Sequence, residues 1–317
     1  MSLTEGLSDQ VMTQLSIVLP VLNEETLVEE LLTQVQQNVS LIATEYEIII
    51  IDDGSSDQTW NLISKRASVN KNIKAIKFSR NFGHHYAITA GLKASTGDWV
   101  VVMDADLQDK PQIISKLYDK AQEGYDVVFV SRHNRPESIF YLGLQKLFYF
   151  TLNLISGMHF DSSQANFSII SRKVVQAFNG FPENARFYGS TIMWLGFKRT
   201  HITADHGVRH SGTSSYTISK RLKLALDISL SFSERPLKFA IVVGMLLSTF
   251  SVIYSAWILY ASIMWSYKVE GWSSIMISIY FLSGILLMVL GVLGVYLGRV
   301  FREVKRRPLY IIDELIN

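Results

Sequence analysis

The chain has 317 residues, enough for one sizeable α/β core and a further part, and its net charge is only +2. A net charge this close to zero gives no support to wholesale nucleic-acid binding, so we expect no nucleic acid among the partners. The sequence contains no cysteine, which excludes a disulfide framework and cysteine-based zinc or thiolate chemistry. Residues 1–14 are polar and lack the pattern of a secretory signal, so the first domain is expected to stay where it is made.

Five apolar runs rich in β-forming residues alternate with stretches of helical pattern in the first half of the chain. They are Leu15–Pro20, Tyr46–Asp52, Ile73–Ser79, Trp99–Asp104 and Val127–Ser131. This alternation predicts a domain over residues 15–215 with a mostly parallel sheet and helices on both of its faces. Ligands bind such sheets at the carboxyl ends of the strands, where Asp52, Asp53, Asp104 and Asp106 collect.

Two amphipathic segments come later in the chain. Residues 140–158 carry apolar side chains at helical spacing, and both a buried core helix and a helix in the membrane interface fit the pattern. Residues 216–235 combine Leu222 and Leu226 with Lys220 and Lys223, which predicts a juxtamembrane amphipathic helix.

Two uncharged segments near the C-terminus, about 239–265 and 275–297, exceed the ~20 residues that ~30 Å of hydrocarbon requires. Aromatic residues fall in the turn between them, and basic residues lie outside both, which predicts that both ends are cytoplasmic. We therefore expect a transmembrane helical hairpin within 236–298 and a basic cytoplasmic tail over 299–317. These features predict a multi-pass protein of the inner (plasma) membrane, in contact with membrane lipids; a buried hairpin in a soluble protein is the alternative.

The strongest chemical signal is Asp104-Ala105-Asp106, at the end of the fourth predicted strand. Two carboxylates at positions i and i+2 can both reach one hard divalent cation, which would bridge them to a diphosphate. A glycosyl donor needs such a cation because its leaving group is a nucleoside diphosphate that gains charge as it departs. Taken alone, the triplet also fits a solvated loop that caps the next helix.

Two further motifs follow the first two predicted strands, LPVLNEE (residues 19–25) and IDDGSSD (residues 51–57). The second fits a turn with capping residues, but a carboxylate at a strand end can also accept a hydrogen bond from a base or a ribose hydroxyl. No G-x-G-x-x-G or P-loop pattern follows a predicted strand, which disfavours dinucleotide and ATP folds.

The series LPVLNEE, IDDGSSD, SRNFGHHYAITAGL, GDWVVVMDADLQD and VSRHNR resembles family 2 glycosyltransferases with the GT-A fold. With two C-terminal spans, the chain is similar to the subgroup that makes polyprenyl-phosphate sugars, such as dolichol-phosphate mannose synthase and bacterial undecaprenyl-phosphate glycosyltransferases. The resemblance covers nearly the whole chain but does not specify the sugar. It implies an inverting transfer from a nucleotide sugar, UDP being favoured over GDP, to polyprenyl (undecaprenyl) phosphate, with Mg²⁺ or Mn²⁺ as cofactor and a role in cell-envelope glycans or glycan modification.

The resemblance also implies roles for individual residues. Base and ribose would be held by Pro20, Asn23, Glu24, Asp52 and Asp53. Metal and diphosphate would be held by Asp104 and Asp106 with Gln108. Arg132 would contact phosphate, a role that guanidinium geometry suits, although a surface ion pair is the alternative.

Three other segments carry candidates by the same resemblance. His84 and His85 lie where relatives often have a basic residue, which suggests contact with sugar or phosphate rather than with a metal. A loop that closes over the phosphates would contain Arg209, Ser214 and Tyr216; Ser215 stands where relatives have lysine, and Lys220 or Lys223 is the candidate substitute.

Relatives place an acidic residue near the acceptor where this chain has Ser163, so Asp161 is the candidate catalytic replacement and a polar loop the alternative. A phosphate monoester is mostly dianionic at neutral pH, since its second pKa is about 6, and needs positioning more than deprotonation.

Two rival functions remain open. A processive membrane polysaccharide synthase is disfavoured because the chain has no Q-x-x-R-W sequence and two spans are few for an export channel. A non-catalytic, membrane-tethered nucleotide-sugar-binding scaffold is disfavoured by the intact carboxylate pair. Whether the protein is a homo-oligomer is left open.

Overall fold

The computed structural model describes residues 14–133, 164–183, 186–205 and 271–317, together with short stretches between 237 and 264. The chain divides into two compact units. One unit contains the sheet and is formed by residues 1–138, 161–214 and 308–317. The other comprises residues 139–160 and 215–307 and contains a long apolar helix.

The sheet unit is built on an eight-stranded sheet with the order β7-β5-β6-β4-β1-β2-β3-β8. The strands are β1 (Leu15–Val21), β2 (Tyr46–Asp52), β3 (Ile73–Phe78), β4 (Trp99–Val102), β5 (Val127–His133), β6 (Gln164–Ser171), β7 (Arg199–Asp205) and β8 (Ile312–Ile316). β1 pairs in parallel with β2 and β4, and β2 with β3, whereas β6 is antiparallel to β4 and β5. The predicted α/β architecture with a mostly parallel sheet is confirmed.

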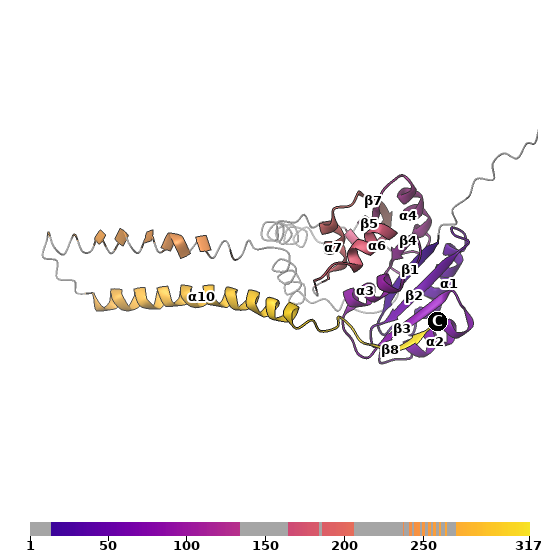
Figure 1. Ribbon diagram of the computed structural model, residues 1–317, viewed down its shortest axis with the longest axis horizontal. Coiled ribbons are helices and arrows are strands. Elements are labelled where there is room, and N and C mark those ends of the chain that lie inside the picture. The colour runs from indigo at the N-terminus through magenta and orange to yellow at the C-terminus, as the bar shows by residue number, and fades with distance from the viewer. Residues whose placement is uncertain are drawn as a thin grey trace, which may run out of the picture. The chain divides into compact units, whose positions relative to one another are not determined.

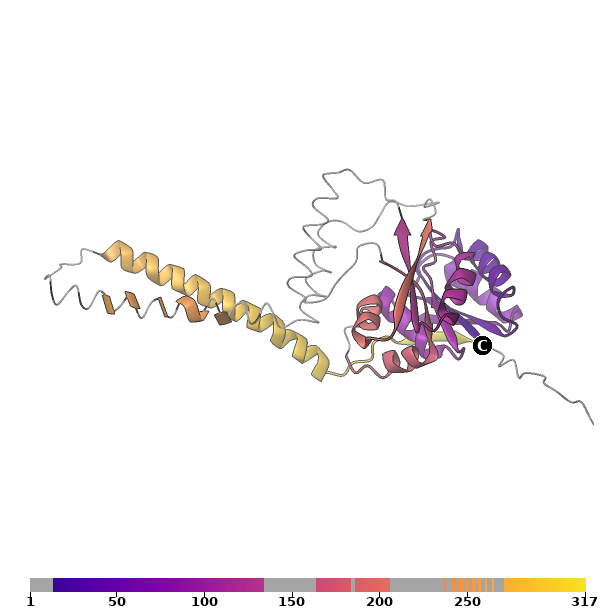
Figure 2. The same ribbon diagram turned by 90° about the horizontal axis from the view of Figure 1, so that it is seen from above.

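Helices cover both faces of this sheet. One face carries α1 (Val28–Val39), α2 (Thr59–Val69) and α4 (Ile113–Gln122), and the other carries α3 (His84–Ala94), α6 (Arg172–Asn179) and α7 (Tyr188–Leu195). Figure 2 shows the strands between these two groups of helices. Helix α3 packs close to the sheet because Gly91 has no side chain: a Cβ there would lie 2.3 Å from Cγ1 of Val18.

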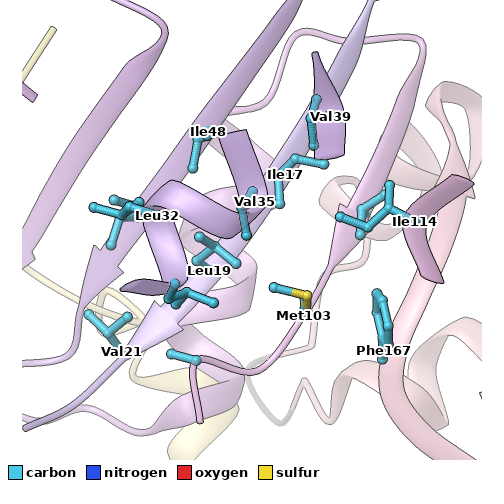
Figure 3. Close-up of a cluster of buried hydrophobic side chains, with 14 of the residues drawn as sticks. Ile17, Leu19, Val21, Leu32, Val35, Val39, Ile48, Met103, Ile114 and Phe167 are labelled. Atoms are coloured by element: carbon cyan, nitrogen blue, oxygen red, sulfur yellow. The ribbon is translucent and has the colours of Figure 1, made fainter. Parts of the chain in front are cut away.

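The core under α1 and α4 holds the strand ends in place. Side chains from β1, β2, β6 and the two helices, with Met103 just after β4, point toward one another in Figure 3, and Ile17, Leu19, Ile48 and Val35 are fully buried. Burial of each such side chain stabilises the fold by roughly 1.5–3 kcal/mol. The loops that follow these strands therefore start from fixed points.

The C-terminal residues differ from the prediction. We expected a basic tail over 299–317, but the preceding helix continues to Val304 and Ile312–Ile316 forms β8, which pairs antiparallel with β3. That part of the prediction is wrong because pairing at a sheet edge, not local sequence, makes these residues a strand. In Figure 1, β8 (yellow) lies beside β3.

The other unit contains α10 (Trp272–Val304), a helix of 33 residues that includes the second predicted span. Within it, the segment Phe281–Val304 contains 18 consecutive residues with a mean hydropathy of 2.3, none of them buried, so its length and composition suit a membrane span. It is the one helix among the described residues that meets this test. The residues described within the first predicted span, 239–265, are helical and mostly exposed, for example Met245 and Phe250.

The predicted two-helix hairpin is therefore not confirmed as a whole, because much of 239–265 lies outside the described residues. The predicted amphipathic segments 140–158 and 216–235 also lie outside them. The domain limits that rest on these segments stay predictions.

Candidate active site

Three loops that carry predicted site residues emerge at one edge of the sheet. β1 pairs in parallel with β2 so that Val21 lies opposite Asp52, and with β4 so that Val18 lies opposite Val102. The loops after these strands hold most of the predicted residues, namely Asn23, Glu24, Asp53, Asp104, Asp106 and Gln108, while Pro20 and Asp52 lie at the ends of β1 and β2 themselves. The parallel topology thus brings to one edge of the sheet residues, such as Asn23 and Asp104, that are more than eighty positions apart in the sequence.

The segment after β4 separates its side chains into two sets. Ala105 and Leu107 are buried and belong to the core, whereas Asp104, Asp106 and Gln108 are partly exposed. Leu107 has a φ of 55°, an unusual left-handed backbone for this residue type, and the Gln108 amide donates to Asp106 Oδ1 at 3.1 Å. The two carboxylates are thus exposed in a segment that the core fixes.

The loop after β1 is bound to the loop after β2. The Asn23 amide donates to Ser55 Oγ at 2.9 Å, and Asn23 Oδ1 accepts from the Ser56 amide at 2.9 Å. Asn23 has a φ of 55°, which asparagine tolerates better than most residues. The Glu24 amide donates to Thr59 Oγ1 at 2.8 Å. These bonds make the two predicted nucleotide-binding motifs one rigid surface.

Asp52 is fully buried, and its two carboxylate oxygens differ. Oδ1 accepts from the amide of Ser55 at 3.0 Å and from its hydroxyl, whereas Oδ2 has no hydrogen-bond partner among the described residues. Burial raises the pKa of Asp52 although the bonds from Ser55 oppose this. A buried acceptor with unused capacity suits a ligand that brings its own donor, such as a base N–H or a ribose hydroxyl.

Asp53 organises the loop before α3. Its carboxylate, 3% exposed, accepts from the Phe82 amide at 2.7 Å and from the Gly83 amide at 3.0 Å. Burial raises its pKa and these bonds oppose the rise. The described contacts of Asp53 are structural, so its predicted contact with substrate stays a prediction.

His84, at the start of α3, lies against the segment that contains Asp104 and Asp106. Its Nε2 is 3.2 Å from Asp104 Oδ1 and 3.3 Å from Nδ2 of Asn166 in β6. Burial lowers the pKa of His84, but the carboxylates of Asp104, Asp53 and Asp106 outweigh burial and leave the pKa above its ordinary value. The sequence indicated His84 only as a sugar or phosphate contact, and it missed Asn166 because it did not predict β6.

His85 has a different environment. Its ring packs edge-on against Phe187 at 5.4 Å, and burial lowers its pKa to about 3. His85 is therefore neutral and part of the packing under the site.

The carboxylate pair fits a hard divalent ion. Asp104 and Asp106 offer oxygen donors, which Mg²⁺ and Mn²⁺ prefer, in a segment where both side chains reach solvent. No group of three or more potential metal-ligating side chains occurs in the part of the chain that the structure describes. An ion held here would take its remaining ligands from a diphosphate and water.

Several predicted residues cannot be added to this geometry. Arg132 lies in β5 beside Ala204 of β7, and only its backbone is described. The others fall outside the described residues, namely Asp161, Ser163, Arg209, Ser214, Tyr216 and Lys220.

Similarity to known proteins shows which family the chain belongs to. Residues 16–178 match glycosyl transferase family 2. The chain belongs to this family. An uncharacterized glycosyltransferase of Synechocystis is 37% identical to it over 303 residues, 95% of each chain. The prophage bactoprenol glucosyl transferase homolog of Escherichia coli is 34% identical over 303 residues, which cover 95% of this chain and 99% of that one.

The fold of this glycosyltransferase also occurs in a solved structure. Glucosyl-3-phosphoglycerate synthase from Mycobacterium tuberculosis, in complex with Mn²⁺, UDP-glucose and phosphoglyceric acid, matches with a TM-score of 0.50 at 19% identity. The match covers 69% of this chain and 78% of the synthase. At this identity it shows the GT-A fold alone. The predictions of a family 2 enzyme with the GT-A fold are confirmed.

Proposed function

We propose that this glycosyltransferase transfers a sugar, with inversion, from a nucleotide diphosphate sugar to a polyprenyl phosphate at a membrane. One observation carries the proposal: the similarity to the Escherichia coli bactoprenol glucosyl transferase homolog extends over 95% of the chain. It therefore includes most of the apolar helix α10 and not the catalytic domain alone. A lipid acceptor gives such a helix a purpose, because the helix would hold the catalytic domain at the membrane that contains the acceptor.

On the donor side, we propose that Asp104 and Asp106 hold Mg²⁺ or Mn²⁺ and that Gln108 lies beside the diphosphate. The ion would neutralise charge on the departing nucleoside diphosphate. The buried Oδ2 of Asp52 and the rigid surface around Asn23 would hold base and ribose. UDP is the proposed nucleotide, on the family resemblance.

On the acceptor side, an oxygen of the lipid phosphate would attack the anomeric carbon from the face opposite the leaving diphosphate. Since the phosphate is already mostly dianionic, the residues proposed here position it rather than deprotonate it. They are Arg209, Ser214, Tyr216 and Lys220, with Asp161 as the candidate replacement for the acidic residue that relatives carry near the acceptor. Arg132 would contact phosphate.

We also propose that the membrane anchor is a two-helix hairpin, over about 239–265 and 275–297, with the catalytic domain cytoplasmic. The sheet supports a second membrane crossing, because strands on both sides of the apolar segments belong to it. β7 ends at Asp205 and β8 begins at Ile312, and both belong to one sheet, so they must lie on one side of any membrane. If α10 crosses the bilayer once, the chain between Asp205 and α10 must cross it an odd number of times.

Protease protection tests this topology. Tags before Met1 and after Asn317 should both be protected in intact cells, while a tag in the turn at residues 266–271 should be cleaved. Cleavage of one terminal tag but not the other contradicts the hairpin.

The function is tested by a screen of nucleotide sugars with undecaprenyl phosphate. The full chain in lipid nanodiscs, with Mg²⁺ or Mn²⁺, should give one lipid-linked monosaccharide, detected by mass. The Asp104→Asn protein, which lacks a proposed metal ligand, is the negative control and should form almost no product. Products with several sugars would favour the processive synthase, and nucleotide binding without turnover on any lipid would refute the proposal.

A further inference from the structure

The C-terminal strand β8 is fastened to the edge of the sheet at both of its ends. Lys77 of β3 pairs with Glu314 at 2.9 Å, and the Asn317 side-chain amide donates to the carbonyl oxygens of Ala67 at 2.8 Å and Ile73 at 2.9 Å. Before β8, the Ser79 amide donates to the Ile311 carbonyl at 3.0 Å. β8 is therefore a defined part of the sheet unit (Figure 1).

β8 contributes little to the core. Ile312 and Leu315 are 45% and 64% exposed, so the strand buries little apolar surface of its own. Its close contacts run instead along β3, from Ile73 at the start of that strand to Ser79 just after its end. A strand with this distribution of contacts is suited to fixing a local segment rather than to stabilising the whole domain.

Aromatic rings continue from this strand into the loop. The ring of Tyr310 stacks on Phe78 with 4.9 Å between centroids and 12° between planes. Phe78 in turn meets Phe82 edge-on at 5.7 Å, and the Arg80 guanidinium lies 3.9 Å from the centroid of the Phe82 ring. Contacts of this kind contribute about 0.5–1.5 kcal/mol each beyond the area they bury.

The loop that Phe82 belongs to leads directly into the active site. The amides of Phe82 and Gly83 both donate to Asp53, and the next residue, His84, lies 3.2 Å from Asp104. An unbroken series of contacts within the sheet unit thus joins the C-terminal segment to one of the two proposed metal ligands.

We propose that the C-terminal segment is a positioning element of the active site: Tyr310 and β8 clamp β3 and, through Phe78 and Phe82, hold His84 against Asp104. The inference rests on the proposed function for its activity readout, because turnover is measured as sugar transfer to polyprenyl phosphate. Tyr310 itself touches no reacting atom. Its loss would loosen the loop at residues 79–83 and misplace the carboxylate, and small misplacements of catalytic groups are costly in rate.

The test compares Tyr310→Ala with Tyr310→Phe, which keeps the stacked ring, in the full chain in nanodiscs. Hydrogen exchange by mass spectrometry follows peptides over residues 79–86 and, as an internal control, residues 15–21 of β1. We expect Tyr310→Ala to speed exchange at 79–86 about tenfold and to lower kcat about tenfold, with KM for the nucleotide sugar changed less than about twofold. Tyr310→Phe should match the wild type in all three.

The following results would overturn the inference or separate it from the proposed function. Unchanged exchange at 79–86, or unchanged kcat, in Tyr310→Ala overturns the inference, as does faster exchange spread equally over β1. If Tyr310→Ala does not fold, Tyr310→Leu, which fills the space without a stacked ring, gives the same comparison. If the wild type transfers nothing to polyprenyl phosphate but the exchange at 79–86 still responds selectively, the proposed function fails and the clamp stands.

Discussion

The two ends of the central sheet use buried carboxylates in opposite ways. At the amino ends of the strands, Glu47 is 5% exposed and all its oxygens have partners: Ser16 Oγ at 2.6 Å, the Thr96 amide at 2.6 Å and Lys74 Nζ at 2.6 Å. At the carboxyl ends, Asp104 and Asp106 are partly exposed and Asp52 keeps one buried oxygen without a partner among the described residues. A saturated carboxylate is structural, whereas one with unused capacity is available to a ligand.

Substitution at the carboxyl end should have the largest effect, and on activity alone. Asp104→Asn or Asp106→Asn removes a proposed metal ligand and should lower kcat by roughly 10³-fold, while the thermal unfolding midpoint stays within about 2 °C. Initial rates of lipid-linked sugar formation measure this. The matched control is Asp119→Asn on the exposed side of α4, which should keep wild-type activity. A folded Asp106→Asn protein with activity near the wild type would refute the metal assignment.

Substitution at the amino end should lower stability rather than activity. Glu47→Gln leaves Lys74 without its ion pair and disrupts the bonds from Ser16 and Thr96, so the free energy of unfolding should fall by about 2–3 kcal/mol. This loss is at the low end for a buried pair because the Lys74 side chain is 31% exposed and can turn to water. Urea unfolding followed by tryptophan fluorescence measures the change. Glu29→Gln, at an exposed position of α1, should shift stability by less than about 0.5 kcal/mol.

The pH dependence of stability sharpens the same contrast. Burial raises the pKa of Glu47, but the bonds from Lys74, Ser16 and Thr96 outweigh it and leave the pKa below its ordinary value of 4.5. A lowered pKa means that the stabilisation is complete above the unfolded-state pKa and is lost as pH falls through the folded-state value. The difference in unfolding midpoint between wild type and Glu47→Gln should therefore be constant from about pH 6 to 7 and shrink below about pH 4.5. A difference that grows with acidification would show that Glu47 is not held as the carboxylate.

The smallest effect concerns the loop next to Asp53. Gly54 has a φ of 76°, and a Cβ there would lie 2.5 Å from the carbonyl carbon of Arg80, so Gly54→Ala should cost about 2 kcal/mol of stability and reduce activity. Gly189 in α7 has nothing within 4 Å of an added Cβ, so Gly189→Ala should leave stability equal or raise it by up to about 1 kcal/mol. The thermal unfolding midpoints of both variants measure this difference in stability. Equal effects would mean that the loop can move away from Gly54.

The sequence by itself determined the parallel core and the location of its chemistry. The runs that form β1 to β5 were predicted to within two residues at each end, because strands buried on both faces, such as β1 and β2, are nearly continuous apolar runs that can be recognised without partners. The motifs at their ends were recognised for the same reason: a polar cluster directly after such a run has to lie at the carboxyl edge of the sheet.

Only the tertiary structure decided the rest. β6, β7 and β8 are strands through pairing with distant neighbours, and β8 is a short, mostly exposed segment whose sequence alone suggested a tail. His84 and Asn166 are 82 positions apart and meet at Asp104 only because β6 pairs antiparallel with β4. Asp53 likewise could not be recognised as the anchor of the loop at Phe82, because its bonds to that loop exist only after α3 packs on the sheet. Local sequence encodes the strands and their polar ends, whereas contacts across the sheet depend on pairing energies that no local pattern contains.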